Sequence, residues 1–209
     1  HTGLAKLEEL VTNINDIIEN RIEKNLKIVS KTVLVDLPSD RSTQLSDFVA
    51  LQEKRIRVQS KFLHGKNVEI EHAVNDLMEL VRSFPLDPHI DPVSQAEIST
   101  VKRNYRYKMY CALLKCTKNS LNMIKERVGN RGGSAGGGFL FVERPFFELF
   151  VNLQTPKVQI TPDLDDVQNA INKSALAVLK CSKALFDWDQ DEVPEEERRT
   201  FFDDITCDL

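Results

Sequence analysis

The stretch 146–188, FFELFVNLQTPKVQITPDLDDVQNAINKSALAVLKCSKALFDW, decides the predicted fold, because its apolar period changes within a few residues. Over 147–154 apolar and polar side chains alternate, which predicts a half-buried strand. Pro156 interrupts the alternation, and the apolar pair at 158 and 160 predicts a second short strand. The period then becomes helical, so a hairpin followed by a helix is the organising prediction.

The predicted helix has a clear start. Thr161 offers a hydroxyl N-cap, and Pro162 fits the first helical position. Asp163 and Asp165 suit the positive end of the helix dipole. An isolated two-stranded hairpin is marginal in water, so we expect its apolar face to lie against the helix 164–185. The face of that helix repeats every three or four residues, at Leu164, Val167, Ile171, Ala175, Val178, Ser182 and Leu185.

Upstream of the hairpin, the same helical period predicts three long helical regions. The first runs from Leu4 to about Val35, with no Gly or Pro inside it, and fits either an antiparallel bundle or a coiled-coil dimer. The second, at 45–84, is a helix pair or one bent helix, with His64-Gly65 as the candidate break. The third begins near 91–97 and ends near Val128. The predicted fold is therefore mostly α, a long-helix antiparallel bundle with a small two-stranded β element near the C-terminal third.

Composition excludes several classes of protein. Of 209 residues, 41% are hydrophobic and 29% charged, as in a soluble and rather helical protein. The net charge of −4 predicts no nucleic-acid partner, and the basic group at 102–108 is expected to be a solvated face or a salt-bridge partner. No apolar run has the length of a membrane span and no signal peptide is visible, so we expect no membrane partner. The start at His1 without Met indicates a fragment.

Side chains that carry chemistry do not converge in this sequence. Cys111, Cys116, Cys181 and Cys207 form no CxxC pair and are expected to be reduced. The Asp87, His89 and Asp91 triplet lies in one proline-rich loop, whereas a metal site usually draws ligands from several elements. The glycine run 129–138 leads into aromatic residues and lacks the Lys-Ser/Thr of a phosphate-binding loop. We therefore predict no catalytic residue, no cofactor-binding residue and no metal ligand in this segment.

The ordered motifs of the C-terminal part resemble the tail, or stem, of an axonemal dynein heavy chain just before the linker. In that family an aromatic-rich strand, a proline and a second strand precede a helix that starts Pro-x-Leu-Asp-x-x-Gln and ends near a Trp. The matching positions here are Pro156, Pro162, Leu164, Asp165, Gln168, Ile171, Asn172, Lys173, Ser182, Lys183 and Trp188. A looser match covers a Val-x-Leu-Pro turn, a Phe-rich helix start and a Val-Glu-Ile-Glu segment, at Val35, Leu37, Pro38, Phe48 and 68–77. The glycine run departs from the family pattern.

The resemblance implies a piece of an ATP-driven, microtubule-based motor of cilia and flagella. It implies that ATP binds in the motor ring of the parent chain and not in this segment. It also implies partners: other dynein heavy chains, intermediate or light chains, docking proteins of the arm, and indirectly the microtubule doublet. The implied location is the cytoplasm, within the cytoskeleton of the ciliary axoneme. The alternative is an unrelated helical scaffold or coiled-coil adaptor, for which a continuous coiled coil would predict no β element.

Four regions follow from these patterns. We predict a helical bundle of the tail at 1–128 and a flexible Gly-rich loop at 129–138. A β-hairpin plus long helix is predicted at 139–188. An acidic segment at 189–209 would, in the family, lead toward the linker.

Overall fold

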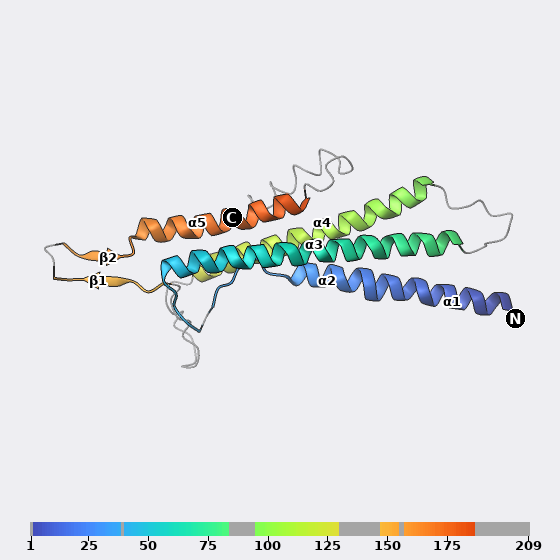
Figure 1. Cartoon of the computed structure of the whole chain (residues 1–209), viewed down its shortest axis with the longest axis horizontal. Coiled ribbons are helices and arrows are strands. Elements are labelled where there is room, and N and C mark those ends of the chain that lie inside the picture. The colour runs from blue at the N-terminus through green and yellow to red at the C-terminus, as the bar shows by residue number, and fades with distance from the viewer. Residues whose placement is uncertain (1, 39, 84–94, 130–146, 155–156, 187–209) are drawn as a thin grey trace. The chain divides into compact units, whose positions relative to one another are not determined.

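The computed structural model describes residues 2–38, 40–83, 95–129, 147–154 and 157–186 (Figure 1). Within this part, long helices accompany one two-stranded antiparallel sheet, which confirms the mostly α class and the β element in the C-terminal third. The chain divides into two compact units. The first holds the described residues of 2–32 and 61–116, and the second holds those of 33–60 and 117–185.

The first unit is made of helices. It contains α1 (Thr2–Asp16), the π-helix η1 (Ile17–Glu23), α2 (Lys24–Lys31), the second half of α3 (Leu45–Ser83) and the first part of α4 (Gln95–Gly129). Within this unit, α1 runs antiparallel to the end of α3 (Figure 1). Its buried apolar side chains are Ile22, Val29, Leu63, Ile70, Ala73, Val74, Leu77, Met78, Ile98, Met109, Ala112, Leu113 and Cys116.

The π-helix η1 is a feature that the helical period did not predict. The backbone N–H of Lys24 donates to the carbonyl of Glu19, five residues earlier. The apolar positions at 14, 18, 22 and 26 advance by three successive steps of four, a spacing longer than the α-helical 3.6. The wider turn of a π-helix compensates for that drift, and Ile22 stays fully buried.

Helix α3 is continuous over 39 residues, which confirms a single helix over this region and excludes both a helix pair and a break at His64-Gly65. Gly65 lies within the helix, and a Cβ added there would have no other atom within 4 Å. A glycine in a helix costs about 1 kcal/mol relative to alanine, which the packing of a long helix offsets.

The second unit combines helices with the hairpin. It contains the extended segment 33–38, the start of α3, the end of α4, and α5 (Leu164–Phe186). Strands β1 (Phe150–Asn152) and β2 (Gln159–Thr161) pair antiparallel, with Val151 opposite Ile160. A small core contains Phe48 of α3, Ala170 of α5, and Phe147, which precedes β1. The rings of Phe48 and Phe147 pack edge to face, with 4.9 Å between their centroids.

The predictions for two helix ends are wrong. The first helical region ends at Lys31 rather than near Val35, because Thr32 adopts extended backbone angles and the β-branched stretch after it continues as an extended segment. Pro162 is not the first helical residue, since α5 begins at Leu164, and Thr161 does not cap α5, since its backbone belongs to β2. Asp163 takes that role: its side-chain carboxylate accepts from the backbone N–H of Asp165 at 3.1 Å.

The prediction of a half-buried strand is also wrong for all but one of its apolar residues. Phe147 is buried, but both strands are exposed along their whole length. The strands extend past the first turns of α3 and α5, so neither helix of this unit covers them (Figure 1). The buried side chains of α5, which include Val178, Cys181 and Leu185, therefore do not cover the hairpin strands.

Candidate functional site

The candidate site is the extended connector 33–38 in the second unit, whose backbone forms hydrogen bonds with several side chains. Leu34 and Val35 are nearly fully buried, although the segment forms neither helix nor sheet. A buried extended backbone must find partners for its N–H and C=O groups. Here side chains of α3 and α4 supply them, so the connector is held by four separate side-chain clamps.

Gln52 of α3 is the central clamp. Its side-chain oxygen accepts from the backbone N–H of Asp36 at 2.9 Å, and its side-chain nitrogen donates to the carbonyl of Asp36 at 2.6 Å. The Gln52 side chain is 2% exposed, so both bonds are shielded from water. A single amide thus takes the place of a neighbouring β-strand.

Three further clamps hold the connector on either side of Asp36. The hydroxyl of Ser120 on α4 accepts from the backbone N–H of Leu34 at 2.9 Å. Arg55 on α3 donates to the carbonyl of Val33 at 3.2 Å, and Arg127 on α4 donates to the carbonyl of Pro38 at 2.8 Å. Because the donors and acceptors come from two helices, the connector fixes the start of α3 against the end of α4.

Helices α4 and α5 meet in the same unit through a buried polar contact. The hydroxyls of Thr117 and Ser182 lie 2.6 Å apart, and Ser182 also donates to the carbonyl of Val178. Burial raises the pKa of the neighbouring Cys181 thiol, and a hydrogen bond with Ser60 opposes that shift. The thiol therefore stays protonated, which makes it an inert core residue rather than a nucleophile.

Two ion pairs of the first unit involve residues of η1. Arg21 and Asp76 form an ion pair at 2.6 Å, and Lys108 lies 3.6 Å from Glu23. Burial, and then the charge of Glu23, raise the pKa of Tyr105. A shallow groove of about 510 Å³ is lined by Glu19, Asn20, Glu23, Lys24, Leu26, Lys27 and Lys108. Its mixed charges are exposed, so they select no ligand by charge.

Of the residues that the sequence singled out for chemistry, the structure describes His64, His72, Cys111, Cys116 and Cys181. His64 and His72 are exposed on α3. Cys111 is exposed, whereas Cys116 and Cys181 are buried free thiols. The Asp87, His89 and Asp91 triplet, Cys207 and the glycine run 130–138 lie outside the described residues. Among the residues that are described, no group of three or more His, Cys, Asp or Glu side chains could hold a metal ion.

In the basic stretch of α4, Lys108 forms an ion pair with Glu23, and its ammonium lies 5.4 Å from the ring centroid of Tyr105. In the ranges the structure covers, helices long and apolar enough to cross a bilayer are absent.

Sequence reasoning missed the connector clamps, although two of them left a signal. Gln52 interrupts the apolar face of α3 four residues after Phe48. Ser120 lies beside the buried Leu121 on α4. A polar side chain on a helix face that is otherwise apolar needs a buried partner, and the Val-x-Leu-Pro turn ending at Pro38 lies shortly before α3 in the sequence. Arg55 and Arg127 gave no comparable signal, because long basic side chains are common on exposed faces.

The fold and the connector define a structural segment: a set of long helices whose side chains form hydrogen bonds with the chain's own connector backbone. Comparison with known proteins gives the family. The chain is 41% identical over 191 residues to the dynein gamma chain of the flagellar outer arm of Chlamydomonas reinhardtii, an alignment that takes in 91% of this chain. It is 23% identical over 232 residues to mouse dynein axonemal heavy chain 8, and 24% over 250 residues to rat dynein axonemal heavy chain 5. The chain is therefore homologous to a segment of axonemal dynein heavy chains.

The homology covers a small part of each relative. The chain spans 4% of the length of the gamma chain and 5% and 7% of the other two. No family model matches the sequence. The match over most of this chain sets aside an unrelated scaffold or adaptor, and the antiparallel hairpin does not fit a continuous coiled coil.

Proposed function

We propose that this chain is the part of an axonemal dynein heavy chain tail that lies just before the linker, and that its role is mechanical. The single observation that carries the proposal is the 41% identity to a flagellar outer-arm gamma chain over 91% of this chain. The placement beside the linker rests on the ordered motifs around Pro162 and Trp188. The parent chain would be an ATP-driven motor of the ciliary axoneme.

The architecture of the described residues supports a load-bearing role. Helix α3 contains 39 residues and therefore extends over about 58 Å without a break. The turn that precedes α3 is the place where a helical stem would yield under load, since backbone outside helices lacks regular hydrogen bonds. Here that turn is the connector, which Gln52, Ser120, Arg55 and Arg127 hold.

We further propose that this segment neither binds nor hydrolyses ATP and that it contributes to arm assembly. The partners would be neighbouring heavy chains, intermediate or light chains, or docking proteins of the arm. Exposed Leu4, Leu7 and Val11 on α1 offer one apolar stripe for such a contact. The microtubule doublet would be an indirect partner.

The test replaces Gln52 with Ala in a full-length heavy chain expressed in a ciliated cell that lacks its own copy. The account predicts normal ATPase activity of the purified motor, together with fewer arms per axoneme or a lower beat frequency. The matched control is Gln168→Ala, on the exposed face of α5, which should leave all three unchanged. A loss of ATPase activity alone, with intact arms and normal beating under load, would place the segment in the catalytic cycle instead.

A further inference from the structure

The hairpin of the second unit presents one apolar face to solvent. Alternation along β1 places Leu149, Val151 and Leu153 on the same side of the strand. Val151 pairs with Ile160 in the register of the sheet, so Ile160 and its neighbour Val158 share that side. All five side chains are between 40 and 75% exposed: Leu149, Val151, Leu153, Val158 and Ile160.

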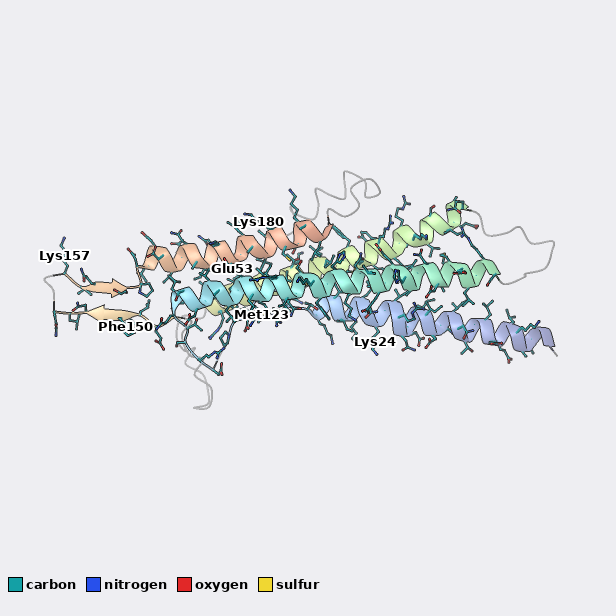
Figure 2. All side chains as sticks on the ribbon, in the orientation of Figure 1. Lys24, Glu53, Met123, Phe150, Lys157 and Lys180 are labelled. Carbon is teal, nitrogen blue, oxygen red and sulfur yellow. The ribbon has the colours of Figure 1, made fainter. Side chains whose placement is uncertain are left out.

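The opposite side of the hairpin is different in kind. It carries Asn152, Gln159 and Thr161, with Phe150 as its apolar member. Figure 2 shows Phe150 on β1 and Lys157 in the turn of the hairpin, beyond the packed helices of this unit. A two-stranded sheet with one apolar and one polar side is marginal in water and is stabilised when another element covers its apolar side.

The charge pattern restricts what can cover this face. Between Leu149 and Pro162 the only charged residue is Lys157, whereas 29% of the whole chain is charged. A charged partner surface would lose hydration on this face, because the five side chains of the face are all apolar and offer it no counter-charge. An apolar stripe, such as one side of an amphipathic helix, gains from burial and loses little.

The size of the face indicates where the covering element comes from. Five aliphatic side chains make a small patch, and a free partner would have to offset the full loss of translational and rotational freedom on binding. A segment of the same polypeptide meets the patch at a high effective concentration, so a small patch suffices. The relatives extend far beyond the matched region, since the chain spans only 4 to 7% of the length of the three compared.

We infer that the apolar side of the hairpin, defined by Leu149, Val151, Leu153, Val158 and Ile160, is the docking face for an amphipathic helix supplied by the same heavy chain from outside these 209 residues. The inference rests on the proposal that this chain is a segment of a dynein heavy chain. It does not depend on the segment lying next to the linker.

Site-specific photo-crosslinking in the full-length, purified heavy chain tests the inference. A benzophenone amino acid replaces Val151 on the apolar side or, as the matched control, Gln159 on the polar side of the same hairpin. After irradiation, mass spectrometry identifies the crosslinked peptides. We expect Val151 to crosslink to one peptide of the same heavy chain that is predicted to be helical, and Gln159 to give no such crosslink.

Some of the other outcomes overturn the inference, and one separates it from the proposed placement beside the linker. A crosslink from Val151 to a different subunit of the arm would make the face an intermolecular interface. Equal crosslinking from Val151 and Gln159 would show that the partner does not select the apolar side. No crosslink from either position after full incorporation would show that the apolar side is not covered. A crosslink to a heavy-chain helix far from the linker would support docking while contradicting the proposed placement, so the two failures are distinguishable.

A second variant measures the energetic consequence of covering. Replacing Val151 with Lys in the full-length chain should raise the hydrogen-exchange rate of the hairpin amides by roughly tenfold or more, because the new charge loses its hydration when the helix docks. Gln159→Lys should leave the exchange rate within about a factor of two, as an exposed substitution does. Equal effects of the two substitutions would contradict a covered apolar side.

Discussion

The connector 33–38 and the hairpin strands are both extended backbone in the second unit, but they differ in burial and in the source of their hydrogen bonds. The connector is buried at Leu34 and Val35, and side chains of α3 and α4 form hydrogen bonds with its backbone groups. The strands pair with each other and leave their apolar side chains exposed. The connector therefore finds its hydrogen-bond partners within this chain, whereas the apolar side chains of the hairpin stay exposed in the part of the chain that the structure describes.

The largest expected difference between the two regions concerns their phenylalanines. Phe48 is 2% exposed and lies against Phe147, so Phe48→Ala should lower the free energy of unfolding by about 3–5 kcal/mol. Phe150 is 62% exposed on β1, so Phe150→Ala should change that free energy by less than about 0.5 kcal/mol. Urea unfolding of the two variants, followed by circular dichroism, makes the comparison. Similar losses would show that the hairpin is part of the core.

The next largest effect belongs to the central clamp. Gln52→Ala leaves the N–H and C=O of Asp36 without their side-chain partner, which should cost about 2–4 kcal/mol. Gln168→Ala, on the exposed face of α5, should stay within about 0.5 kcal/mol. Chemical denaturation with a common baseline separates the two. If Gln52→Ala unfolds at the wild-type denaturant midpoint, the connector is not held by this amide.

A smaller loss is expected at the second clamp. Ser120→Ala removes the acceptor for the buried N–H of Leu34 and should cost about 1–2 kcal/mol. Ser99→Ala, an exposed position on α4, provides the control and should be neutral or slightly stabilising, because alanine is the better helix former. Thermal unfolding resolves a difference of this size. A neutral Ser120→Ala would mean that water replaces the hydroxyl.

The smallest effect concerns the thiols and pH. Exposed Cys111 should react with iodoacetamide in the folded chain, while buried Cys116 and Cys181 react only on unfolding.

Burial raises the pKa of Cys181 above its ordinary value of 9.0, so the folded state holds this proton more tightly. Its contribution to stability is therefore present below pH 9 and is lost as the pH rises through the shifted value. Mass spectrometry of each cysteine at pH 8 and pH 10 checks both statements. Equal rates for Cys111 and Cys181 in the folded chain would contradict the burial of the latter.

The period of the apolar residues was enough to predict the long helices and the hairpin of this chain. It could not predict burial of the strands, because alternation shows that a strand has an apolar side and not that the same chain covers it. It also placed Val35 in a helix, since a buried extended segment and a helix edge carry the same apolar residues. The π-helix was readable from the steps of four between Ile14 and Leu26, which the average period concealed.

Hydrogen exchange measured by mass spectrometry tests the contrast between the connector and the hairpin most directly. The account predicts that in the 209-residue chain the amides of Leu34 and Asp36 exchange slowly while that of Val151 exchanges fast. In the full-length heavy chain the amide of Val151 should become protected and the connector should stay unchanged. Slow exchange at Val151 in the 209-residue chain, or fast exchange at Asp36, would contradict the claim that one extended region is complete and the other is not.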